Sequence, residues 1–331
     1  MMPPSYAAQP GGLLAGSAMF QERFEAIVSN VERVIKGKDG PIRMVITAIL
    51  AEGHLLLEDL PGTGKTMLAR SIAQTIQADT SRVQCTPDLL PSDITGSSVV
   101  DTTTREFKFR AGPVFTNILL ADEINRATPK TQSSLLEAMQ ERRVSVDGVT
   151  HLLPKPFLLL ATQNPIELAG TFPLPEAQLD RFLFKISLGY PDSDAEMEVL
   201  KVNAQEEAID SLEPACTLDD VLALQQFPKR VQVAESIQRY IVDICQASRV
   251  DPSLQLPASP RASLALMRSS RVVAAANGRD HVRPEDVTSV LQPVLAHRIA
   301  LTPDAELRDD TVEKVIERIL SRVKPPMIAA A

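Results

Sequence analysis

Aromatic residues are scarce in this chain of 331 residues, which has no Trp and only three Tyr. Proteins that hold single-stranded nucleic acid need stacking aromatic side chains on a basic surface. This chain instead has a formal net charge of −8. A local basic pore is compatible with that charge, but a surface built mainly to coat nucleic acid is not expected.

Cysteines are also few, and their spacing argues against disulfides and zinc. Cys85, Cys216 and Cys245 lie far apart, with no CxxC pair and no histidine close by. We therefore expect reduced thiols. No apolar run is long enough to cross a bilayer, and the N-terminal residues lack the pattern of a secretory signal. The expectation is a cytoplasmic protein without membrane insertion.

The most informative segment is LLLEDLPGTGKT, residues 55–66. An apolar stretch typical of a buried strand leads into a glycine-bearing turn, and a stretch with helical spacing follows. A helix that begins at such a turn directs its free N–H groups and its dipole at phosphates. In this pattern Lys65 contacts the β- and γ-phosphates and Thr66 holds Mg²⁺. The expected nucleotide contacts in this segment are Asp59, Pro61, Gly62, Thr63, Gly64, Lys65, Thr66 and Met67.

One position departs from the general pattern, which has glycine six residues before the lysine. Asp59 occupies that position here. Aspartate adopts unusual backbone angles more readily than most residues, so the turn is still compatible with the sequence. The alternative is an ordinary glycine-rich connection between a strand and a helix.

Two later apolar stretches end in polar residues suited to hydrolysis of a phosphoanhydride. NILLADE, residues 117–123, predicts the neighbouring strand of the same sheet, with Asp122 holding the Mg²⁺ shell and Glu123 polarising the attacking water. FLLLA, residues 157–161, leads to Asn164, which we expect to orient water against the γ-phosphate. A plain turn residue before proline is the alternative for this asparagine. Together with the glycine turn, the acidic pair indicates an NTPase.

Two arginines are candidates for contact with the γ-phosphate. Arg181 lies in LPEAQLDRF, and an arginine there acts as a finger in a neighbouring subunit's site or simply pairs with Asp180 or Glu176. Arg261 follows a proline at the start of a helical stretch. We expect Arg261 to reach the γ-phosphate, with a surface salt bridge as the alternative. A finger that acts on a neighbour requires self-assembly.

The alternation of apolar and helical stretches over residues 19–189 predicts an α/β domain with a parallel sheet, whose ligands bind at the carboxyl ends of the strands. Insertions near 85–113 and 142–154 are expected, the second as a hairpin around its Asp-Gly pair. Strand signals fade afterwards, so residues 190–331 predict an all-helical lid.

Residues 1–18, rich in Pro, Gly and Ala, predict a disordered tail. A docking peptide anchored by two leucines, Leu13 and Leu14, is the alternative.

The segments EDLPGTGKT, LLADEINRA, ATQNP, LPEAQLDRF and SPRASLAL, in this order, resemble the MoxR family of AAA+ ATPases over nearly the whole chain. Asp at the first P-loop position is usual in that family. The resemblance implies a P-loop AAA+ core and a ring, often a hexamer. By motif match it implies Walker A at Lys65 and Thr66, Walker B at Asp122 and Glu123, sensor 1 at Asn164, the arginine finger at Arg181, sensor 2 at Arg261, and an adenine-covering segment at residues 34–39 with Gly37.

The resemblance therefore implies Mg²⁺-dependent ATP hydrolysis that drives chaperone-like remodelling, activation or metal insertion of a protein partner. A von Willebrand factor A domain protein is the client class that the resemblance adds. Hairpins at the two insertions are implied to face the pore and touch the substrate, with coverage of a sheet edge as the alternative. Arg126 is expected to face the neighbouring subunit. There are two rival functions. The first is a motor that pulls on nucleic acid, which Arg142 and Arg143 beside the second hairpin would permit. The second is a slow nucleotide-gated assembly switch.

Overall fold

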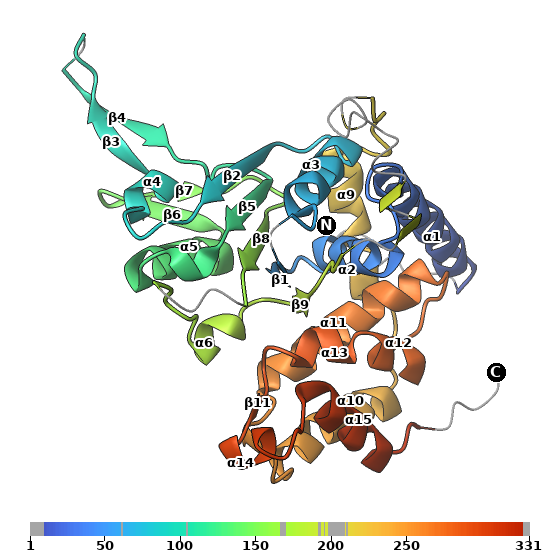
Figure 1. Ribbon diagram of the computed structural model, residues 1–331. Helices are drawn as coiled ribbons and strands as arrows, with labels where there is room; N and C mark the ends of the chain where they lie inside the picture. The colour runs from blue at the N-terminus through green and yellow to red at the C-terminus, as the bar shows by residue number, and fades with distance from the viewer. Residues whose placement is uncertain are drawn as a thin grey trace, which may run out of the picture.

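A parallel sheet between two layers of helices forms one part of the molecule, and a mainly helical part follows it (Figure 1). The computed structural model describes residues 10–60, 62–103, 105–165, 170–190, 193–194, 196–197, 209 and 211–326, with side chains described from residue 16. In that part of the chain no helix is both long and apolar enough to cross a membrane.

The sheet has five strands in the order β2-β5-β8-β1-β9, and every neighbouring pair is parallel. The strands are β1 (Leu55–Glu58), β2 (Thr80–Gln84), β5 (Ile118–Asp122), β8 (Leu158–Gln163) and β9 (Phe184–Ile186). The prediction that the acidic strand β5 lies beside β1 is wrong, because β8 lies between them. Parallel strands need crossover connections, and these let a later strand fill the gap that an earlier connection passed over.

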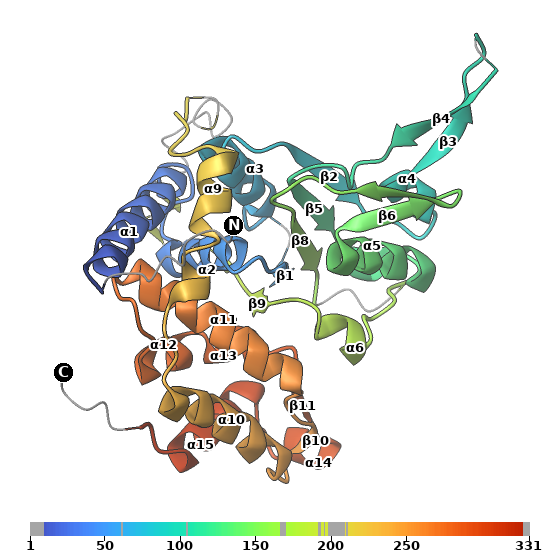
Figure 2. The ribbon, with the colours of Figure 1, turned by 180° about the vertical axis from the view of Figure 1, so that it is seen from behind.

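Alternate residues of the central strands enter two different hydrophobic clusters. Leu55, Leu120 and Leu160 pack on one face with α1 (Pro10–Glu32), α2 (Asp39–Leu50) and α3 (Lys65–Thr75). Leu119 and Leu159 pack on the other face with α5 (Pro129–Glu141). Figure 2 shows α5 from behind. Both faces of the sheet are therefore covered, which explains why these strands are continuous apolar runs.

Helix α1 begins at Pro10, so the prediction of a disordered tail fails for residues 10–18, while residues 1–9 lie outside the described part. Ser17 is buried, and its Oγ donates to the carbonyl of Gly278 over 2.9 Å. Gly16 packs so closely on Phe227 that a Cβ there would lie 2.8 Å from the ring. Contacts with the far end of the chain therefore fix a segment whose composition alone predicted disorder.

Both predicted insertions are present as antiparallel hairpins, the first preceded by α4 (Pro91–Thr95). In the first, β3 (Gly96–Val100) pairs with β4 (Phe107–Ala111), and this hairpin projects well beyond the rest of the molecule (Figure 1). In the second, β6 (Arg143–Val146) pairs with β7 (Val149–Leu152) across the predicted Asp-Gly turn, in which both residues have positive φ. The rings of Phe109 and His151 stack with centroids 3.9 Å apart and join the two hairpins.

The part after residue 211 is mainly helical, and its apolar side chains share one buried cluster with α1, α2 and α3. Its helices are α9 (Leu218–Leu224), α10 (Glu235–Arg249), α11 (Pro260–Ala276), α12 (Pro284–Ser289), α13 (Leu291–Leu295), α14 (Pro303–Glu306) and α15 (Val312–Arg322). It is not all helical as predicted, since β10 (Leu254–Leu256) and β11 (Ala300–Leu301) form an antiparallel pair. These strands are too short to show an alternating pattern in the sequence.

Candidate functional site

The predicted P-loop, acidic pair and asparagine meet in one cavity of about 260 Å³ at the carboxyl ends of the parallel strands. The position agrees with the rule that open α/β sheets bind ligands at this edge. Pro61 lies outside the described residues. The lining residues are Asp59, Gly62, Thr63, Gly64, Lys65, Thr66, Met67, Arg82, Gln84, Asp122, Glu123 and Asn164.

The turn before α3 needs glycine because its backbone has positive φ angles, and not because a larger side chain would clash with its neighbours. Gly62 has φ +82° and Gly64, the N-cap of α3, has φ +88°, while a Cβ at either position would meet no atom within 4 Å. The left-handed region is strained for residues with a side chain. Lys65 Nζ donates to the carbonyls of Asp59 and Leu60, each over 3.1 Å. The ammonium therefore lies over the turn itself, at the positive end of a helix, where phosphate binds readily.

The hydroxyl of Thr162, which is fully buried, fixes both acidic residues. It donates to Asp122 Oδ1 over 2.6 Å and accepts the backbone N–H of Glu123 over 2.8 Å. Glu123 has φ +55°, a left-handed conformation that costs about 1–3 kcal/mol in a residue with a side chain. The bond to Thr162 holds the Glu123 backbone in place, and Glu123 lines the P-loop cavity.

Two side chains of β2 donate hydrogen bonds to these carboxylates. The sequence did not predict either of them as a site residue. Arg82 donates to Asp122 Oδ2 over 2.6 Å, and Gln84 donates to Glu123 Oε2 over 3.0 Å. Glu123 Oε2 also accepts from Arg126, 3.2 Å away. Alternation in TSRVQ places Arg82 and Gln84 on the same face of β2. Only the pairing of β2 with β5 shows that this face meets the acidic pair.

The oxygen donors of this cavity fit Mg²⁺ bound together with a triphosphate. Mg²⁺ favours one or two carboxylates with phosphate and water oxygens, and the Thr66 hydroxyl and the Asp122 carboxylate are donors of this kind. Within the described ranges no group of three or more His, Cys, Asp or Glu side chains is placed to hold a metal. The residues thus suit an ion that the nucleotide brings with it, and that ion would neutralise phosphate charge.

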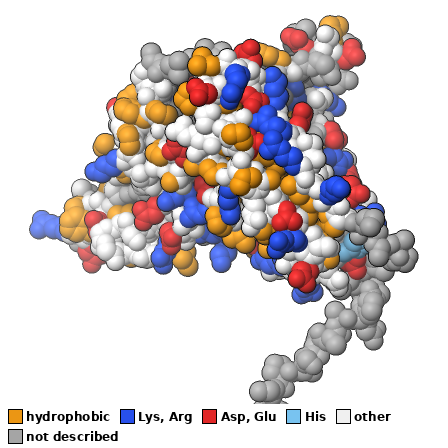
Figure 3. Space-filling view, turned by 90° about the horizontal axis from the view of Figure 1, so that it is seen from below, with side chains coloured by type: hydrophobic (Ala, Val, Ile, Leu, Met, Phe, Trp, Pro, Cys, Tyr) orange, Lys and Arg blue, Asp and Glu red, His pale blue; other side chains and the backbone are white. Residues whose placement is uncertain are grey.

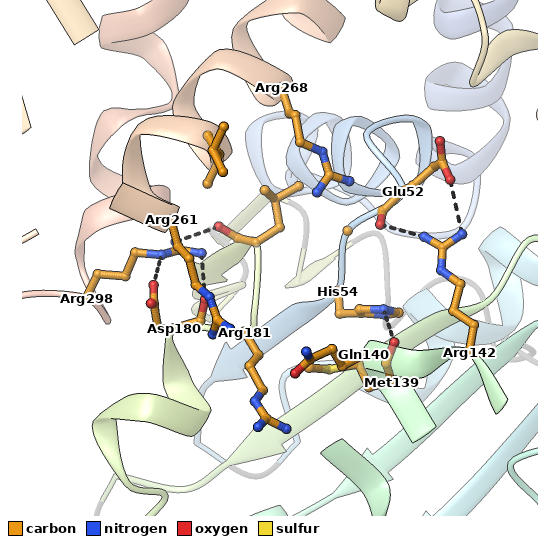
Figure 4. A pocket seen from close by; sticks show the side chains of 14 residues that line it. Glu52, His54, Met139, Gln140, Arg142, Asp180, Arg181, Arg261, Arg268 and Arg298 are labelled. Carbon is orange, nitrogen blue, oxygen red and sulfur yellow. Dashed lines mark hydrogen bonds and ion pairs between the residues drawn. The ribbon is translucent and has the colours of Figure 1, made fainter. Parts of the chain in front are cut away.

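Arg181 and Arg261 line a different cavity of about 320 Å³, and no residue is shared between this cavity and the P-loop cavity (Figure 4). The sequence predicts that Arg261 reaches the γ-phosphate, but in this chain Arg261 does not line the P-loop cavity. Helix α11, which carries Arg261 in its first turn, is attached to the residue before Arg181, since its N-cap Ser259 donates through Oγ to Asp180 Oδ2 over 3.0 Å. Asp180, the C-cap of α6 (Glu176–Leu179), also accepts from Arg298 over 2.8 Å.

This second cavity, called the arginine cavity below, is strongly positive. Its lining includes Arg142, Arg181, Arg261, Arg268 and Arg298 against only two carboxylates, those of Glu52 and Asp180. Arg142 pairs with Glu52 and Arg298 with Asp180. In the described structure Arg181 forms no ion pair, its Nε is buried without a partner, and only a long bond of 3.5 Å links it to the Leu136 carbonyl.

The segment expected over the adenine, residues 34–39, connects α1 to α2 beside the P-loop helix. Val34 belongs to a small apolar cluster against which Met67 packs. Gly37 has φ +69° and does not line the P-loop cavity. The segment is therefore near the P-loop cavity, although Gly37 itself is not brought into that cavity.

The three cysteines are buried and free, in agreement with the expected reduced thiols. Burial, together with the negative charges of Asp122 and Glu123, raises the pKa of Cys85 to about 12. A thiol with so high a pKa does not react as a thiolate at neutral pH.

Comparison with known proteins agrees with this geometry. Residues 54–184 match the ATPase family associated with various cellular activities (AAA), and residues 246–319 match the AAA lid domain. The chain is 41% identical to the chaperone MoxR1 of Mycobacterium tuberculosis, over 99% of this chain and 88% of that protein. It is 31% identical to the MoxR protein of Paracoccus denitrificans, over 92% of this chain and 96% of that one.

The chain belongs to the MoxR family of AAA ATPases. It is also 48% identical to the uncharacterised protein YeaC of Bacillus subtilis, over 92% of this chain and 95% of that protein. The crystal structure of a Cytophaga hutchinsonii protein described as a candidate ATPase superposes with a TM-score of 0.88 at 37% identity, over 95% of this chain and 98% of that one. As a MoxR-type AAA ATPase, the chain binds ATP and hydrolyses it.

Proposed function

We propose that copies of this chain assemble into a ring in which each subunit completes the ATP site of its neighbour, and that the ring remodels a protein client. The observation that carries the proposal is the separation of Arg181 and Arg261 from the P-loop of their own chain. Both arginines are suited to stabilise the charge of a transferring phosphoryl group. On this proposal they act in the site of the adjacent subunit.

The charge of the arginine cavity supports an anionic occupant. Five arginines face two carboxylates there, and Arg181 and Arg261 form no ion pair among the described residues. Arginine forms strong, directional bonds with phosphate oxygens. The triphosphate of a neighbouring subunit would provide the negative charge that this cavity lacks in a single chain.

In the P-loop cavity we assign the roles by chemistry and position. Lys65 and the N–H groups at the start of α3 bind the phosphates, and Thr66 and Asp122 hold Mg²⁺. Glu123 orients and deprotonates the attacking water, while Asn164 positions the same water against the γ-phosphate. When ATP binds, Lys65 Nζ exchanges its hydrogen bonds to the carbonyls of Asp59 and Leu60 for bonds to the triphosphate.

The hairpins favour a protein client. Val100 and Phe107 are paired across the β3–β4 hairpin, and Phe107 is 76% exposed. On the β6–β7 hairpin Leu152 is equally exposed. Exposed apolar side chains on projecting hairpins are typical of surfaces that contact other proteins. A von Willebrand factor A domain protein is one client to test, and similarity to the chaperone MoxR1 supports a chaperone-like role.

The rival function, a motor on nucleic acid, has little support in the charges. Arg142 pairs with Glu52, Arg143 pairs with Glu141, and Lys108 of the first hairpin pairs with Asp101. On the face seen in Figure 3, basic side chains are interspersed with acidic and hydrophobic ones. A nucleic-acid groove would show a continuous basic stripe. Turnover measured with single-stranded DNA, with an unfolded protein and with neither separates the motor, the remodeller and the slow assembly switch.

Mixed assemblies test the shared site. Arg181→Ala leaves a subunit with its own P-loop cavity but no finger, and Glu123→Gln leaves a subunit with a finger but no base. Each variant alone should hydrolyse ATP slowly, and mixing them should restore turnover, because Arg181 of one subunit reaches the intact cavity of the other. Assembly without any gain in turnover on mixing would assign Arg181 a purely structural role.

A further inference from the structure

Asp59, which replaces the usual glycine of the P-loop pattern, has a structural connection that nucleotide binding does not explain. Asp59 is only 5% exposed, and its carboxylate accepts three hydrogen bonds from the segment that follows β9. The donors are Ser187 Oγ at 2.7 Å, Leu188 N at 2.7 Å and Gly189 N at 2.9 Å. A glycine at this position would leave all three donors without this acceptor.

The backbone of Asp59 connects to two other parts of the site. Its N–H donates to the carbonyl of Gln163 over 3.3 Å, directly before the predicted sensor Asn164. Its carbonyl accepts from Lys65 Nζ over 3.1 Å. One residue therefore contacts the phosphate-binding lysine, the end of β8 and the segment after β9.

The segment after β9 is also held from its other side. Lys38 Nζ, in the stretch between α1 and α2, donates to the carbonyl of Tyr190 over 2.6 Å. Gly189 has φ +62°, so the chain turns sharply where its N–H meets Asp59. The segment Ser187–Tyr190 is thus fixed between the P-loop and the stretch that lies beside Met67.

We propose that Asp59 is a positioning residue for ATP hydrolysis, which fixes the P-loop to the segment Ser187–Gly189 and passes nucleotide binding on to that segment. The inference rests on the proposed role of Lys65. When the triphosphate draws Lys65 away from the Asp59 carbonyl, the backbone of Asp59 loses one of its contacts. Because the carboxylate accepts hydrogen bonds from the N–H groups of Leu188 and Gly189, a shift of Asp59 would change these two hydrogen bonds.

Two variants of Asp59 test the proposal. Asp59→Asn keeps the shape but replaces a carboxylate oxygen with an N–H donor group, and Asp59→Gly restores the general P-loop residue. In either variant we expect kcat to fall about tenfold, since small displacements of catalytic groups are costly, while KM for ATP changes less. Asp220→Asn is the matched control, because Asp220 is also a capping carboxylate, bonded to Thr217 in the lid.

A second readout separates positioning from a merely structural effect. In a Glu123→Gln background, ATP should change the hydrogen exchange of the Leu188 and Gly189 amides, and adding Asp59→Asn should abolish that ATP-dependent change. Wild-type kcat in both Asp59 variants, or an equal ATP-dependent change with and without Asp59, would overturn the proposal. If Asp59→Asn does not fold, Ser187→Ala removes one of the three donors, and kcat should then fall about threefold.

Lys65→Ala distinguishes failure of this inference from failure of the proposed site. If Lys65→Ala retained normal turnover, the assignment of the P-loop cavity itself would be wrong. If Lys65→Ala lost turnover while both Asp59 variants kept it, only the role of Asp59 would be wrong.

Discussion

Acid should destabilise this fold through His54, a buried side chain directly before β1. His54 is 6% exposed, its Nδ1 accepts the N–H of Leu159 over 3.0 Å, and its Nε2 donates to the carbonyl of Met139 over 3.1 Å. Both ring nitrogens are therefore satisfied only in the neutral form. Burial and the nearby charge of Arg142 lower the pKa of His54 from 6.5 to about 3.

The direction in which pH changes the free energy of unfolding follows from proton binding at His54. Between the folded pKa of about 3 and the unfolded value of 6.5, the unfolded chain binds a proton at His54 that the folded chain does not. The free energy of unfolding therefore falls as pH falls below 6.5, by up to about 1.4 kcal/mol per pH unit. From pH 7 to pH 5 the loss at this site is about 2 kcal/mol. Burial also lowers the pKa of His297, so His297 acts in the same direction.

Urea unfolding followed by circular dichroism measures this effect, which suits a chain without Trp. His54→Gln cannot take up the proton, so between pH 7 and pH 5 its free energy of unfolding should lose about 2 kcal/mol less than that of the wild type. The comparison stops at pH 5 so that carboxylates with lowered pKa values, such as Asp251, contribute little. Equal pH slopes in the two proteins would refute the argument.

Three other substitutions test the site and the first hairpin. Glu123→Gln should bind ATP yet slow hydrolysis by about 10²–10⁴-fold, as phosphate release would show, and normal turnover would contradict the assignment of the base. Thr162→Val removes the hydroxyl that fixes Asp122 and Glu123 and leaves the Glu123 N–H without this partner, so the free energy of unfolding should fall by about 1–3 kcal/mol. In assays well below the melting temperature kcat should also fall, and an unchanged kcat would argue against this support. Gly96 has φ +88°, and a Cβ there would lie 2.3 Å from the Arg110 carbonyl, so Gly96→Ala should destabilise the protein by about 1–3 kcal/mol. Gly40→Ala, where a Cβ meets nothing within 4 Å, is the control for thermal unfolding, and equal melting temperatures for the two variants would contradict the packing at the hairpin base.

Local patterns predicted the elements of the site well. The P-loop, the acidic pair and the asparagine each follow an apolar strand, and parallel topology brings strand ends to one edge. The Asp-Gly turn likewise predicted the β6–β7 hairpin, because type I′ turns require positive φ at both positions.

The parts that sequence could not supply depend on long-range packing. The position of β8 between β1 and β5 follows from the order of crossovers, which no local pattern encodes. The position of Arg82 and Gln84 beside the acidic pair follows only from the pairing of β2 with β5, which the sequence does not show. The location of Arg261 is fixed by the bond of Ser259 to Asp180, 79 residues earlier in the chain.

If ATP is hydrolysed between subunits, turnover per chain should depend on protein concentration, with assembly size measured in the same solutions. We expect negligible turnover where the protein is a monomer and a rise that follows assembly. Full turnover from monomers at the lowest concentrations would contradict it, because Arg181 and Arg261 would then have no site to complete.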